Sequence, residues 1–298
     1  MVRFRCNSCF KTFTLRKIKN KHKYFDLFRL WVAKGVSVDP LNTTSISNKS
    51  LIKHFHTFLD TPPKLPKLKI PREINLKCDG KYFGRYGCSL VFKENKNIIF
   101  WDFFERETYH NYLYCFSRLL EMGYLIKSVT SDKHGSLLGA VKTALPNIPH
   151  QYCLVHIQRR CETLLTKKPE TIAGQNLLEI VKLVNKIKSS NEKQIFIKWL
   201  SRYEKRFEII LKQRTYANKT WWYTHKNLRL AFNTLKSSIN NMFFYLEDTS
   251  IPKDTNGLEA EFTHLKTKLN IHRGLAKNRK ESYVFWYWFL KSIYLNHH

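Results

Sequence analysis

The stretch from residue 72 to residue 156 alternates strand-like and helix-like segments, and this alternation restricts the folds open to the chain more than any other feature. Three strand candidates come first, at Ile74–Cys78, Ser89–Lys93 and Ile98–Phe104, with turn residues between them. Three sequential strands of this kind predict a meander. The segments that follow mix helical and strand patterns, so the sequence predicts an α/β core.

The rest of the core pattern and the region after it are assigned from periodicity. The remaining core segments are a helix at 108–122, a strand at 125–130, a helix at 135–145 and a strand at 151–156. From about residue 157 to residue 248 the pattern predicts helices only, which indicates a helical insertion. Two further helices are predicted at the end, over 256–269 and, rich in aromatic residues, over Tyr283–Tyr294.

The N-terminal region has its own pattern. Apolar residues at helical spacing over 24–59, broken at Gly35, fit a helix-turn-helix, but any small helical hairpin gives the same pattern. Four prolines in residues 61–71 predict a semi-rigid linker. The expected divisions are a basic arm (1–23), the helix-turn-helix-like region (24–60), the linker (61–71), the first part of the core (72–156), the insertion (157–250) and the last part of the core (251–298).

The charge balance identifies the class of partner. The chain has 52 Lys and Arg against 23 Asp and Glu, a net charge of +29, so it needs an anionic partner. Hydrophobic residues at 43% exclude a disordered basic tail, and the apolar runs are too short for a membrane span. The N-terminus lacks the apolar core of a secretory signal, which predicts a cytoplasmic protein with reduced cysteines. Basic residues interleaved with aromatic ones favour nucleic acid over a membrane surface.

A cysteine pair near the N-terminus has metal-knuckle spacing. Cys6 and Cys9 are separated by two residues, as in half of a zinc ribbon. A tetrahedral Zn²⁺ site needs four ligands, and this pair supplies two. The alternative interpretation is two nearby thiols on a basic arm with no metal.

Acidic residues are scarce, so their positions are informative. Asp79 and Asp132 each follow an apolar strand candidate, and carboxylates at strand ends of an open α/β sheet face the ligand crevice. Two such carboxylates favour Mg²⁺ and therefore two-metal phosphoryl transfer. Glu259 and Glu261 are both candidates for a third acid. Each acid alone has an ordinary explanation as a helix cap or a solvated side chain, so only the set carries weight.

Four motifs together resemble a known family: Cys78-Asp79-Gly80, Ser131-Asp132-Lys-His-Gly135, Cys153-Leu-Val-His156 and Thr255-Asn256-Gly-Leu-Glu259. Their order and spacing resemble those of the Mutator-like and related DDE transposases of bacterial and archaeal insertion sequences, over about residues 72–298. The resemblance implies a ribonuclease H-like mixed sheet, interrupted by an all-α insertion before the catalytic Glu.

The resemblance also implies roles for individual residues. Asp79, Asp132 and Glu259 would ligate two Mg²⁺ or Mn²⁺ ions, and Glu261, on a different helix face from Glu259, is the rival third acid. Asn256, one turn before Glu259, would bond to the metal site or to a phosphate. The remaining accessory residues are Cys153 and His156. Asp102, in the third strand, has no role in the family pattern.

The implied partners are the terminal repeats of the element and target DNA, bound by a homodimer. The basic residues expected to contact DNA lie in the N-terminal arm and in the stretch after Glu259; they are Arg16, Lys17, Lys19, Lys266, Lys268 and Arg273. The arm resembles only the second knuckle of the family's zinc ribbon, as expected of a truncated ribbon. Trp221 and Trp222 are interpreted either as core residues or as rings that stack on an unpaired base.

Two other functions remain open. A decayed or domesticated relative would recognise DNA without cutting it, and the half ribbon favours this. A ribonuclease H-like nuclease would hydrolyse RNA/DNA hybrids or junctions. The three acids and the basic insertion favour the transposase.

Overall fold

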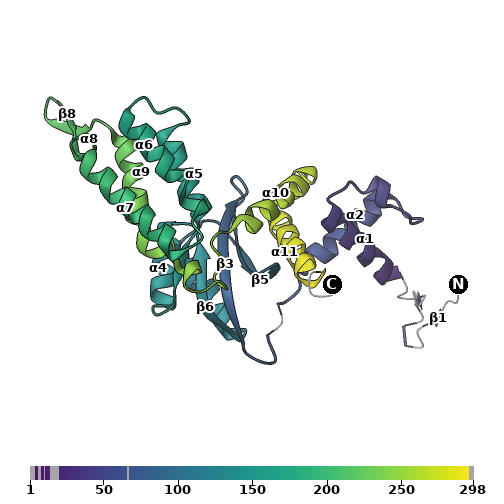
Figure 1. Ribbon diagram of the computed structural model, residues 1–298. Coiled ribbons are helices and arrows are strands. Elements are labelled where there is room, and N and C mark those ends of the chain that lie inside the picture. The colour runs from purple at the N-terminus through teal and green to yellow at the C-terminus, as the bar shows by residue number, and fades with distance from the viewer. Residues whose placement is uncertain (1–3, 6–7, 10, 14–19, 66, 295–298) are drawn as a thin grey trace. The chain divides into compact units, whose positions relative to one another are not determined.

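The computed structural model describes residues 4–5, 8–9, 11–13, 20–65 and 67–294 (Figure 1). The chain divides into two units. Residues 65–263 form one, which we call the sheet unit, and residues 1–64 with 264–298 form the other, which we call the terminal unit. Each is described by itself.

A five-stranded mixed sheet is the centre of the sheet unit, and it confirms the predicted α/β class. Its strands, in the spatial order β5-β4-β3-β6-β7, are β3 (Arg72–Tyr82), β4 (Cys88–Glu94), β5 (Asn97–Phe104), β6 (Tyr124–Ser131) and β7 (His150–Tyr152). The first three strands are antiparallel neighbours, as the meander predicted, whereas β6 runs parallel to β3 and β7 parallel to β6.

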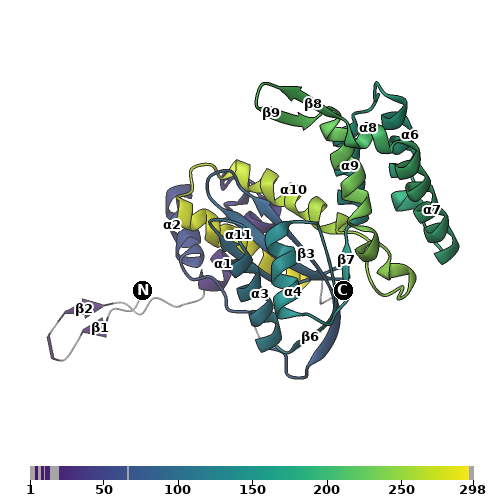
Figure 2. The ribbon, with the colours of Figure 1, turned by 90° about the vertical axis from the view of Figure 1, so that its left-hand side faces the viewer.

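Two helices, α3 (Tyr109–Glu121) and α4 (Gly135–Ala144), cover one face of this sheet (Figure 2). Thr108 sets the start of α3, because its Oγ1 accepts a hydrogen bond from the backbone N of Asn111 (3.3 Å). On β3, Leu76 and Cys78 are fully buried in the core that the helices share with the sheet. Because side chains alternate along a strand, Asn75, Lys77 and Asp79 point to the opposite face.

On that opposite face the chain returns from the insertion. Thr130 Oγ1 donates to the carbonyl of Pro252 (2.7 Å), and Asn75 Nδ2 donates to the carbonyl of Ser250 (3.2 Å). Lys93 Nζ lies 3.5 Å from the carbonyl of Gly257. These contacts bring the first turn of α10 (Asn256–Ile271) onto the face that carries Asp79.

The helical insertion has a separate apolar core. Its helices are α5 (Leu154–Leu165), α6 (Ile172–Val181), η2 (Val184–Lys186), α7 (Ser190–Arg206), α8 (Glu208–Lys212), α9 (Lys226–Lys236), η3 (Ile239–Asn241) and η4 (Phe244–Leu246). The prediction of helices only is wrong in one place. Residues 214–223 form the antiparallel hairpin of β8 (Arg214–Ala217) and β9 (Thr220–Tyr223), because this segment is rich in Thr, Tyr and Trp and turns at Asn218, whose φ is 52°.

Two predicted strand ends are also wrong. Asp79 was expected to follow its strand, but β3 continues to Tyr82, because Asp79 and Gly80 pair with Val91 and Leu90 of β4. The last core strand was expected to reach His156, but β7 ends at Tyr152 and His156 lies on α5. Asp79 is therefore held inside a strand and His156 in the first turn of a helix.

From residue 20 onward, the described part of the terminal unit is built from helices. They are α1 (Asn20–Lys34), η1 (Asp39–Leu41), α2 (Asn48–Leu59), the second half of α10 and α11 (Lys277–Tyr294). Its core is aromatic: the ring centroids of Phe28 and Trp286 are 5.2 Å apart, and those of Trp31 and Tyr283 are 5.4 Å apart. The connection between α1 and α2 spans residues 35–47, longer than a helix-turn-helix turn, so that motif stays a prediction.

The N-terminal arm contains the short paired strands β1 (Phe4–Arg5) and β2 (Thr12–Phe13). Cys9 lies in their connection and is exposed, whereas Cys6 lies outside the described residues. Throughout the described part of the chain, each helix is too short or too polar to cross a membrane.

Candidate active site

Asp79 and Asp132 are brought together by the pairing of β3 with β6. The parallel register ends at Lys77 and Thr130, so the two aspartates follow at equivalent positions two residues later, Asp79 within β3 and Asp132 just beyond the end of β6. Neighbouring strands are about 4.8 Å apart. The pairing of β3 with β6 ends before these two residues, and both carboxylates are half-buried.

Burial raises the pKa of Asp79 to about 7. The positive charge of His156 opposes this rise, the neighbouring carboxylate of Asp132 adds to it, and that of Glu107 adds less. The Gly80 backbone N, which donates to Asp79 Oδ1 (2.8 Å), also lowers this pKa. The shift therefore reports mainly a poorly solvated carboxyl group, and a bound cation would favour its charged form.

Glu107 is a fourth acid at this place, and the sequence analysis missed it. It immediately precedes Thr108, its side chain is 12% exposed, and one of its oxygens accepts a hydrogen bond from the Tyr112 hydroxyl. The same oxygen lies 3.3 Å from His134 Nδ1. The sequence signal was weak: an acid before a predicted helix is ordinarily a cap or a solvated residue.

Gly80 makes room for Glu107. A Cβ at residue 80 would lie 3.0 Å from Cδ of Glu107 and 3.0 Å from Cδ2 of Leu90, closer than ordinary van der Waals contact. Glycine at residue 80, on the face of β3 opposite to Asp79, therefore leaves room for Glu107, and a larger residue would require Glu107 and Leu90 to shift.

Glu259 projects from the first turn of α10 and is held by two side chains of α5. Its Oε1 lies 3.1 Å from His156 Nε2, and Arg159 Nη1 donates to both of its oxygens. The side chain of Glu259 is 31% exposed. His156 also interacts with Asp79 and Asp132, so this imidazole lies among the three predicted catalytic acids.

The predicted accessory residues Cys153 and His156 act as a unit with Thr255. Hydrogen bonding to the Cys153 sulfur raises the pKa of His156 to about 9, against the effect of burial, with smaller contributions from Asp79 and Asp132. Burial alone would raise the pKa of Cys153, but the bonds to His156 and Thr255 lower it. Thr255 Oγ1 lies 3.4 Å from Cys153 Sγ and 3.4 Å from His156 Nδ1, so the residue preceding α10 is joined to the start of α5.

The other predicted residues lie on or near α10. Asn256 is exposed, and its backbone N donates to Asp254 Oδ1 (3.1 Å). Glu261 is half-buried two positions after Glu259. Asp102 lies on β5, where burial raises its pKa and its Oδ1 accepts from the Phe103 backbone N (2.7 Å).

The basic residues predicted to bind DNA differ in their surroundings. Lys266 and Arg273 are exposed. Lys268 is half-buried, and its ammonium donates to the carbonyl of Ala33 in the last turn of α1. The predicted residues outside the described part of the chain are Arg16, Lys17, Lys19 and Cys6.

The donor chemistry of the site fits a hard divalent cation. Mg²⁺ takes oxygen ligands, and the carboxylates of Asp132 and Glu107 each lie within electrostatic range of the Asp79 carboxylate. Glu259, in contrast, is engaged by Arg159 and His156. Within the described residues, the acids, cysteines and histidines form no group of three or more already arranged around a metal position.

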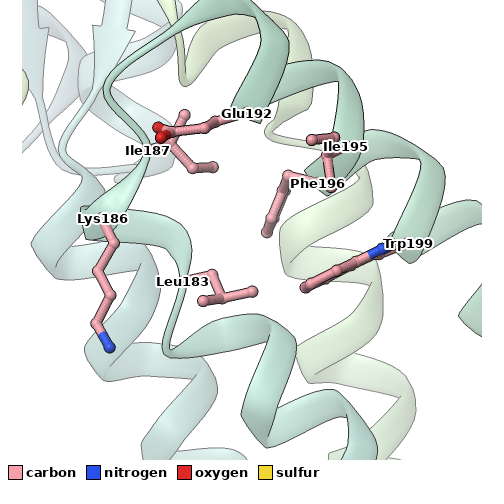
Figure 3. Close-up of a pocket in the computed structure, with 7 residues that line it drawn as sticks. All are labelled: Leu183, Lys186, Ile187, Glu192, Ile195, Phe196 and Trp199. Atoms are coloured by element: carbon pink, nitrogen blue, oxygen red, sulfur yellow. The ribbon is translucent and has the colours of Figure 1, made fainter.

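A separate pocket of about 240 Å³ lies between η2 and α7 in the insertion (Figure 3). It is lined mainly by apolar side chains, among them Leu183, Phe196 and Trp199. The acidic residue of the pocket, Glu192, accepts a hydrogen bond from the Lys188 backbone N (2.6 Å). Its role is therefore to cap the start of α7. This pocket contains none of the clustered carboxylates.

Residues 134–271 match the family model of IS66 family transposases. The match supports a transposase. It begins two residues after Asp132 and covers the insertion and the helix of Glu259, so of the three predicted catalytic acids it includes Glu259 but neither Asp79 nor Asp132. A transposase acts on nucleic acid, which agrees with the +29 charge. The matched family differs from the Mutator-like group that the motifs resemble, and a search of curated proteins gives no match.

Proposed function

We propose that this transposase cleaves DNA at the ends of its element and joins the freed 3′ ends to target DNA with the help of two Mg²⁺ or Mn²⁺ ions. The observation that carries the proposal is the strand register that brings Asp79 and Asp132 to equivalent positions, where burial raises the pKa of Asp79 to about 7. A buried acidic cluster in a chain of charge +29 costs stability unless it serves a bound cation.

The proposed metal ligands are Asp79, Asp132 and Glu259. Bound there, the ions would activate the attacking hydroxyl or water and stabilise the leaving oxygen of an in-line displacement at phosphorus. Glu107 is an alternative third ligand, because it is the acid that acts on the pKa of Asp79 together with Asp132. Glu261 remains the rival on α10.

The remaining residues have positioning roles in this proposal. At neutral pH His156, with a pKa of about 9, is cationic and holds the Glu259 carboxylate at 3.1 Å. Thr255 Oγ1, 3.4 Å from its Nδ1, and the hydrogen bond to the Cys153 sulfur orient that imidazole. Asn256, exposed at the start of α10, would donate to a phosphate in this proposal. The sheet holds Asp79 and Asp132, whereas side chains of α5 hold Glu259.

The proposal extends to the partners. The basic residues Lys266 and Arg273 would contact phosphates of double-stranded DNA, and two copies of the chain would hold two element ends together. The N-terminal arm would contact the element end separately from the catalytic core. Cys6 and Cys9 would be two of the four ligands of a Zn²⁺ ion if a further pair completes the site. The ribonuclease H-like assignment of the core belongs to the same proposal.

The test is a strand-joining assay with Mg²⁺ or Mn²⁺ and DNA that carries the ends flanking the gene. We expect joined products from the natural chain, and none from the Asp132→Asn or Glu259→Gln variant. Asp102→Asn is the matched control, since Asp102 is a partly buried acid on the same sheet without a proposed role. Joining that survives Asp132→Asn would refute the metal site, and cleavage without joining would indicate a nuclease.

A second candidate is a DNA-binding protein that does not cut, and the pairing of Glu259 with Arg159 favours it. The ion pair with Arg159 neutralises the third acid in place of a metal ion, as expected of a site that does not bind metal. The same assay separates the two functions, because this candidate predicts salt-sensitive DNA binding with neither cleavage nor joining.

A further inference from the structure

The hairpin of β8 and β9 presents aromatic rings on both of its faces. In its register Tyr216 lies opposite Trp221 and Arg214 lies opposite Tyr223, so these four side chains share one face. Trp222, the next residue along β9, points to the other face. Figure 2 shows the hairpin projecting beyond the ends of α8 and α9.

These rings are not core residues. Tyr216 is 69% exposed, Trp221 46% and Trp222 48%, whereas the rings of Phe196 and Phe232 are buried inside the insertion. The core interpretation of the Trp pair is therefore wrong. Large exposed aromatic side chains in one place usually mark a binding surface, because water is a poor environment for them.

Arginines hold these rings and add charge beside them. The Arg214 guanidinium carbon lies 4.0 Å from the ring centroid of Trp221, and that of Arg229 lies 4.0 Å from the centroid of Tyr223. The rings of Trp221 and Tyr223 meet edge to face at 5.3 Å. The packing leaves the rings partly ordered before any ligand arrives, which lowers the entropy cost of binding.

The charge around the rings selects the ligand. Residues 212–229 contain five Lys and Arg and no Asp or Glu. The combination of exposed rings with guanidinium and ammonium groups is the one that binds unpaired bases by stacking and the backbone by charge. A second copy of this hairpin would carry the same charge and be repelled, and the paired bases of a duplex have no free face for the rings.

We propose that the β8–β9 hairpin is a binding site for single-stranded DNA, in which Trp221, Trp222 and Tyr216 stack on unpaired bases and Arg214 and Lys219 contact phosphates. The inference goes beyond the proposed reaction. It concerns binding alone and needs none of the clustered acids, so it is tested without metal.

The experiment measures fluorescence anisotropy of a labelled thymidine strand of about 20 nucleotides and of a duplex of equal length, with the full chain in EDTA. We expect Trp221→Ala and Trp222→Ala each to weaken strand binding by roughly tenfold, and to weaken duplex binding by less than about twofold. Trp199→Ala is the matched control, because Trp199 is 44% exposed on α7 of the same insertion. Trp221→Phe keeps a stacking ring and should retain most of the affinity.

Several outcomes would overturn the proposal. They are equal losses for strand and duplex, an equal loss in Trp199→Ala, or unchanged binding in the Trp221→Ala, Trp222→Ala double variant. A change of sedimentation from dimer to monomer in that double variant, with strand binding intact, would assign the hairpin to a second copy of the chain. Circular dichroism confirms that each variant is folded, and a failure of strand joining leaves this result unaffected.

Discussion

The two aspartates and Glu259 are positioned by different kinds of interaction. Asp79 and Asp132 follow paired backbone segments, so their separation is set by the register of β3 and β6. Glu259 is oriented by side chains of α5, His156 and Arg159. Backbone pairing cannot change without breaking the sheet, whereas a side-chain ion pair can be exchanged for another ligand. We infer that the sheet half of the site is rigid and the helix half adjustable.

Asp79→Asn or Asp132→Asn would have the largest effect, because each removes a charge from the rigid half. We expect strand joining to fall roughly 1,000-fold, the upper range for loss of one charge-stabilising group. DNA affinity should stay within about twofold, since the phosphate contacts come from basic residues. The assay is strand joining alongside anisotropy. Equal losses of joining and of binding would show that these acids maintain the fold.

Acid should destabilise the sheet half through His150. Burial lowers the pKa of His150 from 6.5 to about 4, and its Nε2 lies 2.8 Å from Ser131 Oγ at the end of β6. Between pH 6.5 and 4, His150 is therefore protonated in the unfolded chain but stays neutral in the folded chain. The free energy of unfolding should fall by about 3 kcal/mol across this window.

Urea unfolding at pH 7 and at pH 4 measures this effect in the natural chain and in His150→Gln. The variant should lose the part of the pH dependence that His150 contributes. His272, buried in the terminal unit with a pKa lowered to about 4, should keep its own part, so His272→Gln is the matched comparison. Identical pH profiles in the natural chain and His150→Gln would contradict the assignment.

Gly80→Ala tests how closely the sheet half is packed. The added Cβ would press on Glu107 and Leu90 at 3.0 Å, and both side chains must shift to accept it. We expect strand joining to fall about tenfold, because small displacements in an active site are costly. Gly135→Ala is the control, since a Cβ there meets no atom within 4 Å. Similar activity in the two variants would show that Glu107 does not need its present position.

Arg159→Ala tests whether the helix half is adjustable and should have the smallest effect. The Arg159 side chain is 57% exposed, so loss of this ion pair should change stability by less than about 1 kcal/mol. If Arg159 competes with a metal for Glu259, the Mg²⁺ concentration for half-maximal joining should fall a few-fold. Arg160→Ala, at an exposed neighbouring position, should leave it unchanged. An increased Mg²⁺ requirement would mean that Arg159 helps to bind the substrate.

Sequence periodicity predicted the sheet better than it predicted the site. Strands such as β4 and β6 were found from their apolar residues, because burial of a strand leaves a local pattern. Asp79 and Asp132 were singled out for the same reason, as acids next to such runs. Glu107 was missed because its surroundings come from the separate residues Gly80, Tyr112 and His134, a nonlocal relation that leaves no local pattern.

The hairpin and the terminal unit show the same limit. The Lys-rich and Leu/Ile-rich pattern of residues 157–248 as a whole suggested helices throughout, and only the pairing of β8 with β9 shows which rings stay exposed. The aromatic pattern of α11 predicted a helix but not its partners. Those partners, Phe28 and Trp31 of α1, lie about 250 residues earlier in the chain.

The hydrogen bonds of Thr255 to Cys153 and His156 have a consequence for the changes of length that the insertion can accept. Leu154 N also donates to the carbonyl of Lys253 (3.1 Å), so the chain leaves the sheet and comes back to it at one point. About a hundred residues between these positions form a closed excursion with its own core. Because the cost of closing such a loop grows only slowly with its length, the excursion can lengthen, shorten or exchange its hairpin while the junction keeps Glu259 beside the sheet.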